Sequence, residues 1–313
     1  MGTGSNLRIV SLLPGLTEIA VALGFEDNLV GRSHECDYPK SVKTLPVCSE
    51  PKYNIPETAN SADINQSVNE LLKKGLSVYR IDEEKLRLLK PDLILTQDHC
   101  EACAVSFSEV EDAINNYLGK ETTVISVSPS DLTGVKESFR TVANALGASQ
   151  QGKQLITQMN QRFENIERGV RNRKKPSVAA IEWIDPLMTA GNWMPELIDI
   201  AGGKSLLAET GTHSPSINWR DILKADPDLL LVVPCGYKIN QTVKEMESLT
   251  SKAGWNSLAA VQNNSVYILD GHNYFNRPGP RLADSAEILA EILNPSGFDF
   301  GFEGSGWERW KVL

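Results

Sequence analysis

Two cysteines separated by two residues, Cys100 and Cys103, form the pattern in this sequence with the widest choice of chemistry. Such a pair can ligate a metal, form a redox disulfide or remain inert. A structural zinc site needs four nitrogen or sulfur ligands, so other loops would have to contribute. The side chains available for this are His34, Cys36, His99, Cys235 and His272. We expect most of these thiols to be small buried hydrophobes, with a metal site or a redox pair at Cys100 and Cys103 as the alternatives.

Motifs of the common enzyme classes do not occur in the sequence. It has no glycine-rich phosphate loop, no Gly-x-Ser-x-Gly and no His-Glu-x-x-His. The adjacent carboxylates Glu83 and Glu84 fall on the face of a predicted helix, where solvation is their usual explanation. The sequence therefore favours a protein that is not an enzyme and requires no cofactor.

Polar and aromatic side chains gather in the loops that follow the predicted strands, at residues 13–15, 32–39, 97–103, 183–193, 234–237 and 271–281. These loops hold three of the four histidines, four of the five cysteines, and Trp183, Trp193, Tyr237 and Tyr274. In open α/β sheets, ligands bind beyond the carboxyl ends of the strands. Aromatic walls with a few polar groups suit a sizeable, partly apolar small molecule. We therefore predict one cleft between two walls of loops, and only a surface position for His213.

Short apolar runs alternate with segments of helical periodicity, which predicts parallel sheets with helices on both faces. The longest helix is predicted over residues 149–175, where apolar residues recur on one stripe. Ser149 is its predicted N-cap, basic residues fill its last turn, and Pro176 stops it. Near the start of the chain, Thr17 is the predicted cap of a helix that ends at Gly24.

The two halves of the chain resemble each other residue by residue. The numbers of three matched pairs all differ by 178: Glu18 and Glu196, Gly24 and Gly202, Leu29 and Leu207. Later in each half, Pro91 matches Pro227 at a difference of 136. The difference of 42 between these two offsets predicts an insertion in the first half. The predicted fold is α/β, with two similar Rossmann-like lobes, residues 6–146 and 176–313, joined by one long helix in residues 147–175.

The composition is that of an ordinary globular protein, with 313 residues, of which 41% are hydrophobic and 23% charged. A net charge of −9 argues against nucleic acid or an anionic membrane surface as a partner. No apolar run is long enough to span a membrane, and the N-terminus lacks the pattern of a signal peptide. The odd count of five cysteines suggests reduced thiols. These features predict a monomer in the cytoplasm, with export as the alternative if a leader was removed.

Five segments carry a resemblance to a known family: RIVSLLPGLTEIAVALG, GRSHECDYP, LLKPDLILTQDHCEACAVS, EWIDPLMTAGNWMPELIDIAGG and YFNRPGPRLAD. They resemble the cobalamin-type substrate-binding proteins of ABC transporters, whose wider family serves the uptake of vitamin B12, haem and iron–siderophores. The resemblance extends over residues 8–295, with its motifs in order in both halves. It implies the class III substrate-binding fold, in which two α/β lobes joined by one long helix hold the ligand between them.

Under this resemblance the ligand is a corrinoid such as cobalamin or a related metal chelate. The resemblance assigns Pro14, Gly15, the loop around Glu35, Trp193 and Arg277 to the ligand site, although Glu35 stands where B12 carriers tend to have an aromatic residue. Together with the loops described above, the candidate ligand-binding set is Pro14, Gly15, His34, Glu35, Cys36, Tyr38, Cys100, Cys103, Trp183, Trp193, Cys235, Tyr274 and Arg277.

The resemblance also implies docking to an ABC-transporter permease through one acidic residue on each lobe. The first docking position matches Glu84, whereas Arg220 stands at the second, next to Asp221. This inverted charge, together with the reduced-looking cysteines, leads us to expect a cytoplasmic corrinoid-binding relative. The alternative is a cytoplasmic metal- or thiol-dependent protein that uses Cys100 and Cys103 on the same scaffold.

Overall fold

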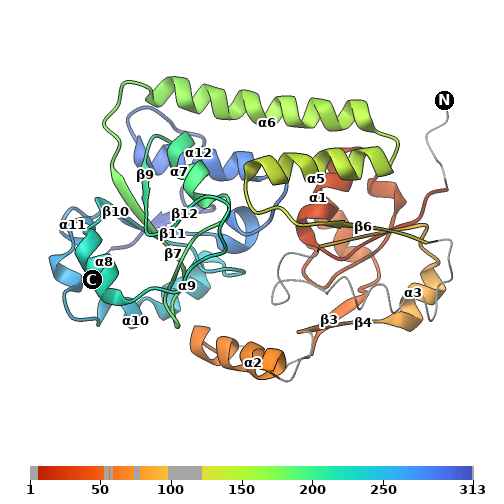
Figure 1. The fold of residues 1–313 in the computed structure, drawn as a ribbon, viewed down its shortest axis with the longest axis horizontal. Coiled ribbons are helices and arrows are strands. Elements are labelled where there is room, and N and C mark those ends of the chain that lie inside the picture. Colours follow the sequence, from red (N-terminus) through yellow and green to blue (C-terminus); the bar gives the residue numbers. More distant parts are fainter. Residues whose placement is uncertain (1–5, 53–55, 57–58, 74–77, 98–121, 312–313) are drawn as a thin grey trace.

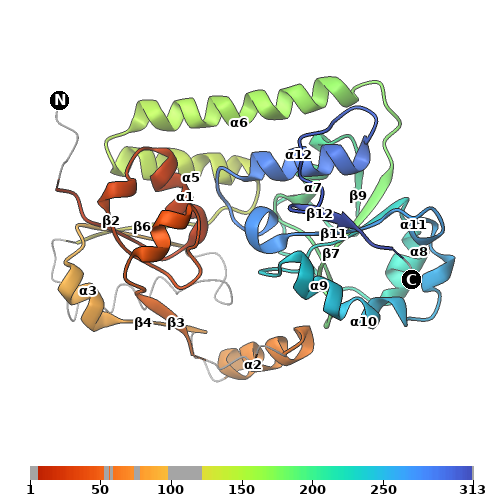
Figure 2. The same cartoon turned by 180° about the vertical axis from the view of Figure 1, so that it is seen from behind.

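The chain folds into two α/β lobes that lie side by side along one long helix, α6 (Ser149–Val170) (Figure 1). The computed structural model describes residues 6–52, 56, 59–73, 78–97 and 122–311. Each lobe has its own parallel sheet, and the reverse view in Figure 2 shows α6 running over both lobes. The predicted fold class is confirmed. None of the helices in the described part of the chain is both long and apolar enough to cross a membrane.

The N-terminal lobe is built on a parallel sheet in the order β2-β1-β5-β6. Its strands are β1 (Ile9–Ser11), β2 (Leu29–Arg32), β5 (Leu93–Gln97) and β6 (Thr123–Val127). Strands β1 and β5 begin with apolar residues and are completely buried, as expected for a parallel sheet covered on both faces. Its helices are α1 (Pro14–Ala22), α2 (Ser61–Lys73), α3 (Glu83–Leu89) and α5 (Leu132–Ala145).

The C-terminal lobe repeats this order with β9-β7-β10-β11 and adds antiparallel strands β8 and β12. The strands are β7 (Ser177–Trp183), β8 (Met188–Thr189), β9 (Lys204–Leu206), β10 (Leu229–Val232), β11 (Val266–Leu269) and β12 (Trp307–Arg309). The helices are α7 (Met194–Ile200), α8 (Trp219–Ala225), α9 (Ile239–Glu245), α10 (Glu247–Thr250), α11 (Ala259–Gln262) and α12 (Leu282–Leu293), with a π-helical turn at Gly271–Phe275.

Equivalent turns end the matched helices of the two lobes. Gly24 follows α1 with a φ of 90°, and Gly202 follows α7 with a φ of 84°. Lys90 ends α3 with a φ of 44°, and Asp226 ends α8 with a φ of 40°. The first pair differs by 178 in residue number and the second by 136, as in the sequence repeat. The repeat therefore corresponds to matched structural units.

The predicted insertion in the first half has a definite structure. It contains α2 and a separate antiparallel pair of strands, β3 (Ser49–Pro51) and β4 (Tyr79–Ile81). Figure 1 shows α2 away from the main sheet of its own lobe and on the side opposite α6. The insertion therefore adds a second place where the lobes meet.

Helix α6 packs along its length rather than standing free between the lobes. Its buried stripe is Ile156, Met159, Phe163, Ile166 and Val170, which belong to one core shared by both lobes. The stripe packs against α5 in one lobe and against α7 and α12 in the other. Arg162 adds ion pairs to Asp284 and Glu287 on α12. The two lobes therefore share a broad apolar base.

Two predicted helix caps are wrong. Helix α6 begins after Ala148, and Ser149 instead donates to the side chain of Asn144 at 2.7 Å. It ends at Val170 rather than residue 175, because the chain must turn to enter β7, and Pro176 just before this strand already accepts the Lys204 amide of β9. Helix α1 begins at Pro14, whose fixed φ suits a first helical position, so Thr17 lies within the first turn.

Candidate functional site

A cavity of about 890 Å³ lies between the two lobes, and both contribute to its walls. The lining includes Gln97 at the end of β5 and the segments that follow β1, β2 and β6 in one lobe and β7, β10 and β11 in the other. The predicted cleft at the carboxyl ends of the strands is therefore present. Its volume is near the top of the range of roughly 300–1,000 Å³ that is usual for small-molecule sites.

Part of the sequence-predicted set lines this cavity: Pro14, Gly15, Glu35, Trp183, Trp193, Cys235 and Arg277. The two tryptophans are held in place by hydrogen bonds. Trp193 is 8% exposed and donates its indole N–H to the Phe275 carbonyl at 2.9 Å, whereas Trp183 donates to the Asp185 carbonyl at 3.0 Å. These bonds orient both rings before any ligand arrives. That these residues contact a ligand remains a prediction.

Gly15 allows the lobes to approach each other at the base of the cavity. A Cβ atom at this position would lie 2.6 Å from the carbonyl oxygen of Pro278 in the other lobe. That distance is shorter than real Cβ contacts, so a side chain here would force the lobes apart. Gly15 thus has a packing role in addition to its place in the lining.

Four other predicted residues lie outside the lining. His34 is half-buried against the Tyr79 ring and Ser49, and Cys36 is completely buried beside Thr17. The Cζ atom of Arg281 lies 4.0 Å from the centroid of the Tyr38 ring, and Tyr274 packs against Phe302. The sequence placed them correctly in strand-end loops but did not reveal which way each side chain points. Cys100 and Cys103 lie outside the described residues.

Helix α2 supplies a wall that the sequence analysis missed. Asn60, Ile64, Asn65 and Val68 from this region line the cavity. The amide and hydroxyl of Ser61, which begins α2, donate to the Glu245 carboxylate of the other lobe at 2.9 and 2.6 Å. The 42-residue mismatch between the halves located this segment, but nothing in its sequence indicated that it crosses to the C-terminal lobe.

The C-terminal wall places an aromatic pair beside carboxylates. Trp183 and Tyr237 meet edge to face, with ring centroids 5.5 Å apart. The Tyr237 hydroxyl donates to Glu245 at 2.7 Å, and burial together with this carboxylate raises the pKa of Tyr237 far above its usual value. His213 is exposed, as predicted, and it also lines the cavity. A neutral phenol and a neighbouring carboxylate thus face the ligand space.

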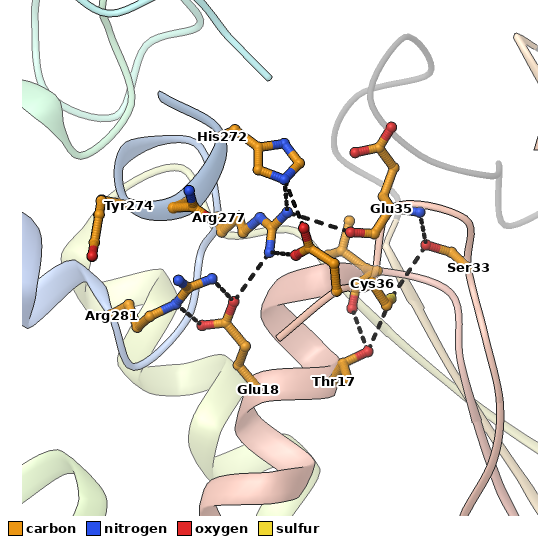
Figure 3. A network of polar contacts seen from close by, with 12 residues as sticks. Thr17, Glu18, Ser33, Glu35, Cys36, His272, Tyr274, Arg277 and Arg281 are labelled. Atoms are coloured by element: carbon orange, nitrogen blue, oxygen red, sulfur yellow. Dashed lines mark hydrogen bonds and ion pairs between the residues drawn. The ribbon is translucent and has the colours of Figure 1, made fainter. Parts of the chain in front are cut away.

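A buried ion pair joins the lobes beside the cavity (Figure 3). Arg281 donates to the Glu18 carboxylate at 2.6 and 3.0 Å. Burial raises the pKa of Glu18, although the hydrogen bonds and charge of Arg281 oppose this shift. The matched residue in the other lobe, Glu196, also reaches across and accepts the Leu132 amide at 2.8 Å. Equivalent carboxylates in the two lobes therefore each bond to the other lobe, Glu18 to a cation and Glu196 to a backbone amide.

Arg277, in the network that Figure 3 shows, forms another bond between the lobes. It donates to Asp37 at 2.7 Å and to the Glu35 carbonyl at 3.3 Å. Burial favours the neutral form of Asp37, but the hydrogen bond of His272 and the charge of Arg277 outweigh it and hold the pKa of Asp37 well below its ordinary value. The cation of Arg277 is thus already balanced within the protein.

The thiols in the described part of the chain are mostly shielded. Cys36 is 0% exposed and accepts from the Thr17 hydroxyl at 3.0 Å, and burial raises its pKa. Burial raises the pKa of Cys48 to about 11. Thiols of this kind are poor nucleophiles and poor metal ligands. Among the described residues, no group of three His, Cys, Asp or Glu side chains could hold a metal ion, so the predicted metal or thiol centre gains no support.

These features define a class: two related α/β lobes on one helical backbone, with a sizeable cleft between them. The family model described as periplasmic binding protein matches residues 9–272, and the chain belongs to this family. It is a substrate-binding protein, and the resemblance inferred from the sequence is confirmed at this level.

Relatives and solved structures agree with this assignment. The ABC transporter substrate-binding lipoprotein YvrC of Bacillus subtilis is 28% identical over 298 residues, covering 93% of this chain and 81% of YvrC. A vitamin B12-binding protein of Photorhabdus laumondii is 24% identical, covering 93% of this chain and 89% of the relative. A periplasmic haem-binding protein from Pseudomonas aeruginosa has a TM-score of 0.71 at 18% identity, covering 97% of this chain and 98% of that one. The periplasmic vitamin B12-binding protein of Vibrio cholerae has a TM-score of 0.64 at 22% identity, covering 92% and 98%.

The predicted cytoplasmic location is wrong. The matching family is periplasmic, and the relatives include a lipoprotein of an ABC transporter, which points to a place outside the cytoplasm. The prediction depended partly on unpaired cysteines. Because Cys36 and Cys48 are buried with raised pKa values, they can remain unpaired without a reducing compartment.

Proposed function

We propose that the protein binds a corrinoid, such as cobalamin, in the cleft between its lobes and delivers it to an ABC-transporter permease. The observation that carries the proposal is the cavity of about 890 Å³, whose walls combine tryptophan rings with carboxylate and amide side chains. The relatives named for vitamin B12 and for an ABC transporter support the ligand class and the partner.

The charge of the lining favours a corrinoid over haem. The described walls contain the carboxylates of Glu35, Glu182 and Glu245 against the cations of Lys244 and Arg277. Arg277 is already paired with Asp37, which leaves the acidic side in excess. The propionates of haem would meet this excess unfavourably, whereas the amide arms of a corrinoid can donate hydrogen bonds to carboxylates.

Tyr237 supports the same choice. A tyrosine that ligates haem iron must ionise. The Tyr237 phenol instead donates to Glu245, and its raised pKa disfavours the phenolate. As a hydrogen-bonding wall residue it suits a ligand that brings its own donors and acceptors.

The test is a titration of the purified protein with cobalamin, ferric haem and a ferric siderophore, followed by absorbance and calorimetry. We expect saturable binding of cobalamin and weaker binding of the other two. Trp183→Ala should weaken cobalamin binding by about tenfold, because a large aromatic contact contributes about 1–2 kcal/mol. The matched control is Trp219→Ala, which removes a partly buried tryptophan that stacks on Trp255 away from the lining. Failure of cobalamin to bind at tens of micromolar would contradict the proposal.

A further inference from the structure

Gln97 is the last residue of β5, and its side chain lies in the lining of the cavity. The residue is only 6% exposed. Within the part of the chain that the structure describes, its side-chain amide makes no hydrogen bond. An amide that is kept from water costs free energy unless it bonds to another group. The lining therefore holds a buried polar group that the described protein does not satisfy.

The fold does not require a polar residue at this position. Side chains alternate across a strand, so Gln97 shares a face of β5 with Leu95, which belongs to the core common to both lobes. At the offset of 136, the matched residues are Leu231 in β10 and Val233 directly after it. Val233 is completely buried and belongs to the same core. An apolar residue therefore completes this row in the C-terminal lobe, and an amide takes its place in the N-terminal lobe, where the strand meets the cavity.

Gln97 also differs from the other carboxamides of the described lining. Their residues are half-buried or exposed, so that water can reach them: Asn60, Asn65, Asn192, Gln241 and Asn276. The backbone of Gln97 is held by a central strand, opposite Val127 of β6. A polar group on a rigid strand keeps its position before the ligand arrives.

The chemistry of a carboxamide indicates what would bind to it. Its oxygen accepts, and its nitrogen has two N–H donors. A second carboxamide can satisfy both kinds of group at once, through two N–H···O bonds. A carboxylate only accepts and an ester has no N–H, so either would leave the oxygen of Gln97 without a donor. A site with such a buried partner discriminates strongly against an analogue that lacks the matching group.

We propose that Gln97 binds a peripheral carboxamide of the ligand through two hydrogen bonds. It thereby selects a corrinoid with intact amides over one whose side chains are acids or esters. The inference rests on the proposed function, because it requires a corrinoid in the cleft.

The test uses two corrinoids that both have cyanide at the two axial positions and differ in their side chains. Dicyanocobinamide carries amides, whereas heptamethyl dicyanocobyrinate carries methyl esters without an N–H. Gln97→Met keeps the length of the side chain but removes its amide. It should weaken the binding of dicyanocobinamide by about tenfold and leave the binding of the ester unchanged, as measured by absorbance titration.

Two further variants control for effects on the fold. Gln66→Met makes the same substitution at an exposed residue of α2, whose amide donates to Glu70 outside the lining, and it should change neither affinity. Gln97→Val introduces the residue type that the matched position already has in Val233. It should remain folded in urea denaturation and show the same selective loss as Gln97→Met.

The outcomes separate the two proposals. If the Gln97 variants leave the ratio of the two affinities unchanged, Gln97 does not recognise an amide, although corrinoid binding stands. If the unaltered protein binds neither corrinoid, the proposed function fails and this inference fails with it.

Discussion

The two lobes share a core but differ in what they add to it. The order β2-β1-β5-β6 recurs as β9-β7-β10-β11, and Glu18 and Glu196 make matched crossings between the lobes. The N-terminal lobe adds α2, and the C-terminal lobe adds β8 and the loop that carries His213. The shared carboxylates join the lobes, whereas the added parts form unlike walls of the cavity, and α2 contributes one more contact between the lobes through Ser61 and Glu245. We infer that the scaffold and the specificity of the site can be altered separately.

The largest expected effect separates the two matched carboxylates. Glu18→Gln should lower the free energy of unfolding by about 3–5 kcal/mol, because it leaves the cation of Arg281 buried without its partner. Glu196→Gln keeps an acceptor for the Leu132 amide and should cost about 1 kcal/mol or less. Urea denaturation of both variants measures the difference.

A double variant controls for the shape of the site. Glu18→Gln combined with Arg281→Met removes both charges, and it should recover most of the stability lost in Glu18→Gln alone. Equal losses in Glu18→Gln and Glu196→Gln would mean that the ion pair contributes no more than the backbone crossing.

The next effect tests the contact between α2, an element that the C-terminal lobe has no counterpart for, and Glu245. Ser61→Ala removes a hydroxyl bond to Glu245 that closes α2 against the other lobe. A hydrogen bond to a carboxylate contributes about 1.5–3 kcal/mol, so the bound ligand should dissociate roughly tenfold or more faster. Ser67→Ala is the control on the same helix, because its hydroxyl donates to the Asp63 carbonyl within α2 and, among the described residues, makes no bond to the other lobe. Stopped-flow displacement measures both rates, and equal rates would show that α2 does not retain the ligand.

The sequence predicted the shared parts of the lobes better than the added ones. Periodicity and the repeat located most helices and strands, because both depend on short-range patterns that recur in the two halves. The walls depend instead on pairs that are distant in sequence, such as Ser61 with Glu245, which no local pattern encodes. Strand-end position likewise indicated the loop of Glu35 and Cys36 but not that only Glu35 lines the cavity.

The pH dependence of stability should depend on the crossing that Asp37 makes with Arg277. The pKa of Asp37 in the folded state is below its ordinary 3.8, so its contribution is complete above that value and is lost as the pH falls through the folded pKa. Denaturation at pH 3 and pH 6 should show a smaller acid loss in Asp37→Asn than in the unaltered protein. An unchanged acid loss would exclude Asp37 as its source.

The smallest effect concerns the surfaces at which the matched helices begin. Glu84 on α3 and Arg220 on α8 are both exposed, and their numbers differ by the same 136 as the repeat. We expect that Asp221 does not act as an acidic docking residue in place of Arg220, because its carboxylate accepts the Asn218 amide at 2.9 Å in a capping box. We therefore expect a permease that meets a negative N-terminal lobe and a positive C-terminal lobe.

Charge reversal at either position should slow docking without changing ligand affinity. Glu84→Lys and Arg220→Glu should each lower the association rate with the permease by about threefold to tenfold at low salt, since exposed charges act mainly on encounter. Surface plasmon resonance on reconstituted permease measures the rates, and Glu83→Lys is the neighbouring control for charge alone. If Arg220→Glu instead speeds docking, the permease must present basic residues to both lobes. The lobes would then differ in their own charge but not in the partner that they meet.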